Sequence, residues 1–242
     1  MASPLRTDIH VSEDLEKLSL RAAELFVSCS GESTTSKKNF RAALSGGSTP
    51  KRLHALLASE PFRSRVDWRG VEVFFGDERC VPPEHRDSNF GAANEALLSR
   101  VPARVHRILG ELPPREAALR YEEEVRRAFG FEAGVPSLDL VYLGLGADGH
   151  TASLFPGTAV LGETERLAVE VYVERLESWR VTLTLPVLNA ARKVVFLVSG
   201  RAKAEIVREV IAGPDGGYPA SLVRPTGGSV LWLLDRAAAS LL

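Results

Sequence analysis

The stretch LDLVYLGLGADGH (138–150) decides the fold class of this chain, because it joins a buried strand to a glycine-rich turn. Its first half, LDLVYLG (138–144), is too uniformly apolar for a strand with one wet face, and it predicts a strand in a sheet covered on both sides. Comparable apolar strands are predicted before and after it, at FRAALS (40–45), VEVFFG (71–76), KVVFLVSG (193–200) and SVLWLLD (229–235).

Amphipathic stretches between these strands predict helices. One helix is expected from Ser12 as N-cap to about Ser28, followed by a loop from Ser30 to Asn39. Others are expected after Thr49 as N-cap, after Ser88, over 114–129 and through 206–210. The alternation of strands and helices predicts a single α/β domain over residues 1–242 with a largely parallel sheet. The period-two runs at 167–173 and 180–186 predict a small antiparallel insertion.

Composition narrows the class of partner. The chain of 242 residues has 30 Lys plus Arg against 31 Asp plus Glu, a net charge of -1, which predicts binding to neither nucleic acid nor an anionic membrane. Its two cysteines, Cys29 and Cys80, have no paired spacing for a disulfide framework or a zinc site. The first ten residues lack the apolar core of a signal peptide, and no apolar run is long enough to span a bilayer. We therefore expect a soluble cytoplasmic protein.

Polar turns follow several predicted strands, and ligands of open α/β sheets bind beyond the carboxyl ends of strands. In Ser45–Pro50, Gly46 and Gly47 let backbone N–H groups approach an anion, and Ser48 adds a hydroxyl at a helix start. This turn is either a phosphate cradle or a tight connection that needs glycine and a cap. It is not a P-loop, because the Gly-Lys-Ser/Thr pattern is absent.

Charged residues follow two other strands. Asp77 and Arg79 come directly after VEVFFG, where they suit the binding of hydroxyls and phosphate, unless they belong to a solvated loop. Lys203 follows the strand that ends near Ser199, and Arg180 opens RVTLTLP. Both cations are either parts of a phosphate site or ordinary charges flanking a strand or helix.

The turn after residue 143 formally contains G-x-G-x-x-G, the dinucleotide-binding pattern, at Gly144, Gly146 and Gly149. That pattern should open a long helix, but Pro156 limits the following segment. Asp148 and His150 also occupy the place where a pyrophosphate would approach. The sequence therefore does not predict a nicotinamide cofactor.

His150 is the candidate general base, because neutral imidazole accepts a proton from water near neutral pH. Asp148, two residues earlier, is expected to orient the ring or to stabilise its charged form. The other four histidines, at positions 10, 54, 85 and 106, are expected to be surface or loop residues. No two histidines have metal-ligand spacing, so no metal is implied.

Taken together, these motifs resemble the 6-phosphogluconolactonase family. The resemblance rests on ALSGGSTPKRL, FFGDERCVPPEHRDSNF, LVYLGLGADGHTASLFPGT, RVTLTLP and VVFLVSGRAKAEIV, which occur in the family's order from position 43 to about 207. Glucosamine-6-phosphate deaminases share S-G-G-S-T-P and D-G-H. However, the acid that follows D-G-H in deaminases falls on Phe155 here, and their D-E-Y is replaced by D-E-R.

The resemblance implies a Rossmann-like three-layer α/β/α sandwich and hydrolysis of 6-phospho-D-glucono-1,5-lactone to 6-phosphogluconate in the oxidative pentose phosphate pathway. It implies no obligatory metal or organic cofactor. The expected partner is a small-molecule sugar-phosphate lactone, and the chain is expected to be a monomer or a weak homodimer.

We expect the turn at 46–48, with Asp77, Arg79 and Lys203, to hold the phosphate and ring hydroxyls. His150 would then activate water, and Arg180 or a backbone N–H would stabilise the oxyanion. Two alternatives stay open. One is an amino-sugar-phosphate deaminase or isomerase with Asp77 as the base at carbon. The other is a non-catalytic sugar-phosphate sensor.

Overall fold

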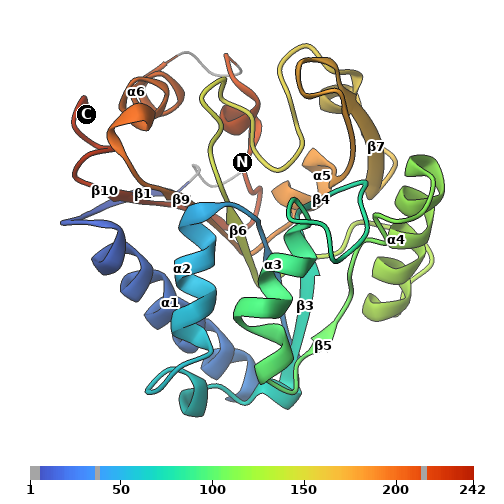
Figure 1. Ribbon diagram of the computed structural model, residues 1–242, viewed down its shortest axis with the longest axis horizontal. Helices are drawn as coiled ribbons and strands as arrows, with labels where there is room; N and C mark the ends of the chain where they lie inside the picture. The colour runs from blue at the N-terminus through green and yellow to red at the C-terminus, as the bar shows by residue number, and fades with distance from the viewer. Residues whose placement is uncertain (1–5, 36–38, 214–216) are drawn as a thin grey trace.

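The computed structural model describes residues 6–35, 39–213 and 217–242 of the protein. Within these residues the strands form two sheets. The larger has the order β1-β10-β9-β6-β2-β3-β5, with all neighbours parallel (Figure 1). Its strands are β1 (Arg6–Ser12), β2 (Phe40–Leu44), β3 (Val71–Phe75), β5 (Arg104–Val105), β6 (Leu140–Leu143), β9 (Lys193–Val198) and β10 (Ser229–Asp235). The smaller is antiparallel and contains β4 (Asp77–Arg79), β8 (Ser178–Leu183) and β7 (Ala168–Val173). The predicted α/β class, mostly parallel sheet and antiparallel insertion are all confirmed.

Helices cover both faces of the parallel sheet. The group α1 (Leu15–Thr35), α2 (Ser48–Leu57) and α3 (Asn89–Ala96) lies together on one face (Figure 1). Right-handed crossovers place α4 (Pro114–Phe129), α5 (Leu185–Asn189) and α6 (Ala204–Ala212) on the other. The central strands β3, β6 and β9 are almost wholly buried, as their apolar sequences predict.

Several predicted boundaries were wrong. The strand β1 was not predicted, because RTDIHVS has no buried apolar run; it forms by pairing along its length with β10. The first helix begins at Leu15 and continues to Thr35, through part of the expected loop. The helix α2 starts at Ser48 with Gly47 as its N-cap, two residues before the expected N-cap Thr49. Asp77 opens a short strand rather than a loop.

Two histidines expected at the surface or in loops are buried. His54 lies on the inward stripe of α2 with Leu53 and Leu57, and burial lowers the pKa of its imidazole to about 4. His106 stacks on Phe74 with ring centroids 4.5 Å apart. Burial lowers the pKa of His106 as well, so both rings are neutral near pH 7, and His106 Nδ1 also lies 2.6 Å from Glu124 Oε1.

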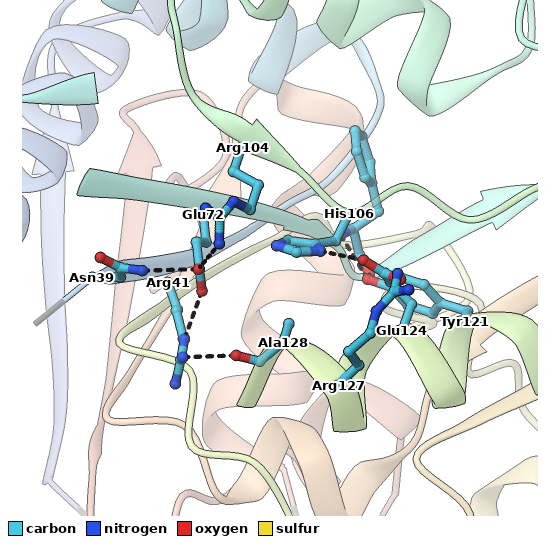
Figure 2. Close-up of polar contacts among 10 residues, drawn as sticks. Asn39, Arg41, Glu72, Arg104, His106, Tyr121, Glu124, Arg127 and Ala128 are labelled. Carbon is cyan, nitrogen blue, oxygen red and sulfur yellow. Dashed lines mark hydrogen bonds and ion pairs between the residues drawn. The ribbon is translucent and has the colours of Figure 1, made fainter. Parts of the chain in front are cut away.

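A polar cluster ties α4 to strands β2, β3 and β5 (Figure 2). The buried Glu72 accepts hydrogen bonds from Asn39 (2.9 Å), Arg41 (2.8 Å) and Arg104 (3.2 Å). Arg41 also donates to the carbonyl of Ala128 at the end of α4, at 2.8 Å. These bonds satisfy a charge that would otherwise be costly to bury.

Tyr121 of α4 hydrogen-bonds to the backbone of Phe75, the last residue of β3, as a neighbouring strand would. Its buried hydroxyl accepts a hydrogen bond from Phe75 N at 2.9 Å and donates one to Phe75 O at 2.8 Å. This contact fixes the residue that immediately precedes the Gly76–Asp77 turn.

We expect Tyr121→Phe to lower the free energy of unfolding by about 1–3 kcal/mol, because it leaves buried backbone groups of Phe75 unpaired. Urea unfolding should show a lower midpoint with an unchanged slope. Tyr172→Phe, at a tyrosine that is 42% exposed, is the matched control and should leave the midpoint in place. Equal midpoints for the two variants would contradict the assignment.

Candidate active site

A cavity of about 270 Å³ lies at the carboxyl ends of β9, β6, β2 and β3, four neighbouring strands of the parallel sheet. The chain leaves β2 toward β3 but leaves β6 toward β9, so the strand order reverses between β2 and β6. Open α/β sheets bind ligands at such a switch point. Eight of the nine predicted site residues line this cavity: Gly46, Gly47, Ser48, Asp77, Arg79, His150, Arg180 and Lys203.

Asp148, the ninth predicted residue, lines a neighbouring cavity and reaches the first through His150. Its Oδ1 lies 2.5 Å from His150 Nδ1. Gly146 makes this contact possible, because a Cβ there would lie 1.9 Å from His150 Nδ1. Gly149 has a φ of +75°, and a Cβ there would lie 2.4 Å from the ring of Tyr218. Gly146 therefore allows the close packing of the imidazole–carboxylate pair, and Gly149 allows Tyr218 to pack against the turn.

The imidazole of His150 stacks on Phe155, with ring centroids 4.1 Å apart and planes inclined by 25°. Burial lowers the pKa of His150 by more than the hydrogen bond and charge of Asp148 raise it. Burial acts to raise the pKa of Asp148, but the hydrogen bond and charge of His150 outweigh it and the pKa is lowered overall. A neutral imidazole beside an ionised carboxylate is the state required of a general base near pH 7.

Three cations line the same cavity without a carboxylate partner among the residues that the structure describes. Arg79 of β4 lies directly opposite Arg180 of β8 in the antiparallel register. The Nε of each guanidinium is buried and has no hydrogen-bond partner in the described chain. Burial lowers the pKa of Lys203, an effect that the charge of Asp148 opposes. Like charges opposite each other destabilise a sheet, so this arrangement favours an anionic ligand.

Asp77 is held rigidly at the cavity wall. Its Oδ2 accepts a hydrogen bond from Ser153 Oγ at 2.6 Å, and its Oδ1 accepts one from Asn89 Nδ2 at 3.2 Å. Asn89 in turn packs against Gly46, where a Cβ would lie 1.8 Å from the Asn89 Oδ1 atom. Asp77 thus links the turns after β2, β3 and β6.

Glu78, an acid of the D-E-R motif that was not among the predicted site residues, anchors the loop that carries Arg79. Its carboxylate accepts hydrogen bonds from the backbone N–H groups of Arg79 (2.8 Å), Asn89 (2.6 Å) and Phe90 (2.7 Å) and from Ser88 Oγ (3.0 Å). Burial raises the pKa of Glu78, which the backbone donors oppose. Because the Glu78 carboxylate binds the first N–H groups of α3, its charge also lies at a helix N-terminus.

Asn89, Ser153 and Arg175 were also missed. Asn89 follows the recognisable helix cap Ser88, whose hydroxyl accepts from Gly91 N at 2.9 Å, so a signal for an ordered turn was present. Nothing in the sequence around Arg175, at a hairpin tip, indicated that it would reach Asp148. Its Nη2 lies 2.6 Å from Asp148 Oδ2.

The arrangement can bind an anion and activate water within one cavity. The cations and the glycine-rich turn at 46–47 supply donors, and His150 supplies a base. Across the described ranges there is no cluster of three or more His, Cys, Asp or Glu side chains suited to a metal ion. Among the same residues, no helix is long and apolar enough to cross a membrane.

Known proteins resemble the chain over nearly its whole length. The family described as glucosamine-6-phosphate isomerases/6-phosphogluconolactonase matches residues 13–232. The 6-phosphogluconolactonase of Synechocystis sp. is 42% identical over 205 residues, with 81% of this chain and 82% of the relative covered. That of Rattus norvegicus is 36% identical, with 100% and 96% covered.

A solved structure named 6-phosphogluconolactonase from Trypanosoma cruzi superposes with a TM-score of 0.87 at 32% identity. The match covers 100% of this chain and 98% of that one. Both the sequence and the three-dimensional arrangement of the strands therefore agree with the predicted resemblance. The chain belongs to the glucosamine-6-phosphate isomerase/6-phosphogluconolactonase family.

Proposed function

We propose that the protein hydrolyses 6-phospho-D-glucono-1,5-lactone to 6-phosphogluconate. The observation that supports this most directly is that His150, bound by Asp148, lines one small cavity together with three cations. Among the described residues, none of these cations has a carboxylate partner. Relatives at 36–42% identity over most of the chain are named 6-phosphogluconolactonase. The substrate has an anionic phosphate at one end and a lactone carbonyl at the other, which matches a site with an anion end and a base.

Binding of the phosphate orients the carbonyl. We assign Arg79 and Lys203 to the phosphate, with the turn at 46–48 supplying backbone and hydroxyl donors. Because Arg180 lies opposite Arg79 in the strand register, we assign its guanidinium to the same phosphate-binding end of the site. Anchoring this remote group holds the lactone beside the imidazole, so that binding energy is used for orientation.

The chemical step uses His150 and water. Asp148 occupies Nδ1, which leaves Nε2 to take a proton as a water oxygen bonds to the carbonyl carbon. The tetrahedral intermediate then breaks its bond from that carbon to the ring oxygen. The protonated imidazole returns its proton to the ring oxygen, which becomes a hydroxyl, and the new carboxylic acid ionises to water.

The alternative of an amino-sugar-phosphate deaminase finds less support in the site. The position that carries an acid after D-G-H in deaminases is Phe155, whose ring is buried against His150. Asp77, the base in that alternative, has both carboxylate oxygens engaged by Ser153 and Asn89. The cytoplasmic location and the monomeric or weakly dimeric state expected from the sequence stay predictions.

We expect His150→Ala to reduce lactone hydrolysis by about 10²–10⁴-fold, the usual contribution of a general base. The lactone is generated from glucose-6-phosphate, and product is followed through 6-phosphogluconate dehydrogenase. His10→Ala, at an exposed histidine of β1, is the control and should keep full activity. Near-normal turnover of His150→Ala would remove the residue from the mechanism, and ammonia release from glucosamine-6-phosphate by the unaltered protein would favour the deaminase.

The acidic limb of kcat/KM should have its midpoint below 6.5, the ordinary value for histidine, because the pKa of His150 is lowered and the base works only when neutral. Activity is therefore retained as the pH falls to 6.5 and is lost below the folded-state pKa. Asp148→Asn should move the midpoint lower still, since it removes the negative charge that raises the pKa of His150. Rates measured against pH for both proteins check this, and a midpoint above 6.5 in the unaltered protein would contradict it.

Arg79→Ala should raise KM by about tenfold to a hundredfold, the effect of one hydrogen bond to a charged group, with a smaller change in kcat. Arg86→Ala is the matched control, because Arg86 lies in the same loop with its side chain 90% exposed. Steady-state kinetics of the two variants test the assignment. Unchanged KM for Arg79→Ala would place the phosphate elsewhere.

A further inference from the structure

Arg175 lies outside the substrate cavity but contacts both groups that hold His150. Its Nη2 atom is 2.6 Å from Asp148 Oδ2, while the other oxygen of Asp148 binds His150. Its guanidinium carbon is 5.2 Å from the centroid of the Phe155 ring, on which His150 stacks. The contacts form a closed ring of four side chains: His150, Asp148, Arg175 and Phe155.

The four side chains come from two segments that are distant in the sequence. His150, Asp148 and Phe155 belong to the turn after β6, whereas Arg175 is in the short helix η5 (Glu174–Leu176) between β7 and β8. Glu177 closes this hairpin with a left-handed φ of +45°. Through Arg175, the hairpin tip thus contacts the segment that carries His150.

Asp148 needs a partner on its second oxygen if it is to hold the imidazole in one orientation. A carboxylate bound through one oxygen alone can rotate about its terminal torsion, which is broad. Arg175 occupies the second oxygen and lies over Phe155, so both supports of the imidazole have fixed positions. Neighbours of this kind that orient a catalytic group contribute by keeping it within a fraction of an ångström of its productive position.

We propose that Arg175 is a positioning residue for His150, acting through Asp148 and Phe155. The expected change in kcat rests on the proposed function. The expected change in the pKa of His150 does not depend on that function. Exposed ion pairs generally contribute little, and the Arg175 side chain is 52% exposed. We therefore expect the loss of Arg175 to change the imidazole of His150 and not the stability of the fold.

The charged groups around the imidazole come from several elements. Asp148 and Asp77 raise its pKa, and Arg175 lowers it. Arg79, Arg180 and Lys203 line the same cavity and stay in place in any Arg175 variant. Removal of Arg175 therefore takes one positive charge from the surroundings, and the pKa of His150 should rise.

Two measurements on full-length Arg175→Ala test the proposal. NMR titration of the His150 imidazole, assigned with His150→Ala, should show a pKa higher than in the unaltered protein. Kinetics should show kcat lowered by about tenfold to a hundredfold with KM nearly unchanged, because Arg175 does not line the substrate cavity. The acidic limb of kcat/KM should move upward with the NMR value.

Arg175→Lys should restore the pKa of His150, because it keeps the charge, but only part of kcat, because an ammonium lacks the flat fork of guanidinium. Leu176→Ala, at the next residue of the hairpin tip and 46% exposed, is the control for disturbance of the hairpin and should match the unaltered protein in both measurements.

A kcat within twofold of normal for Arg175→Ala, or a pKa of His150 that does not rise, would overturn the proposal. A loss of kcat shared by Leu176→Ala would also overturn it, since the hairpin rather than the guanidinium would then be responsible. If the unaltered protein does not hydrolyse the lactone, the proposed function fails, while the NMR titration still decides whether Arg175 acts on His150.

Discussion

The parallel alignment of four neighbouring strands is the constraint on which the site depends. Because β9, β6, β2 and β3 run in the same direction side by side, the turns after all four meet at one edge of the sheet. The reversal of strand order between β2 and β6 opens a space at that edge. The glycine-rich turn at 46–48, His150 and two charged segments from distant parts of the chain therefore share a cavity of about 270 Å³.

The small antiparallel sheet supplies the second half of the site and is joined to the first through Gly76. Gly76 N donates to Leu44 O at 2.9 Å, and Gly76 O accepts from Leu183 N at 2.8 Å. This junction brings β8 beside β4 and sets Arg79 opposite Arg180. Two like charges held in register oppose folding, while the buried carboxylates of Glu78 and Asp77 nearby accept hydrogen bonds. The arrangement fits the phosphate binding that we propose.

The surroundings of His150 show how one family framework is adapted to one reaction. An apolar ring, Phe155, lies flat against the imidazole where the deaminase pattern places an acid, and a single carboxylate remains to orient it. Burial then keeps the imidazole neutral against the pull of Asp148. An imidazole that is unprotonated near pH 7 would suit the activation of water that we propose for His150.

The amino-acid sequence by itself determined the buried strands, the glycine-rich turns and eight of the twenty residues that line the cavity. Those features are local: an apolar run needs a covered sheet, and a glycine followed by a helix cap needs a tight turn. Only the tertiary structure decided that RTDIHVS forms a strand, that His54 is buried, and that Arg175 reaches Asp148. The strand and the ion pair each depend on a partner far along the chain, and His54 is a polar residue on the inward stripe of α2. Pairing with a distant strand or carboxylate is a property of the assembled fold, so the sequence near each residue does not reveal it.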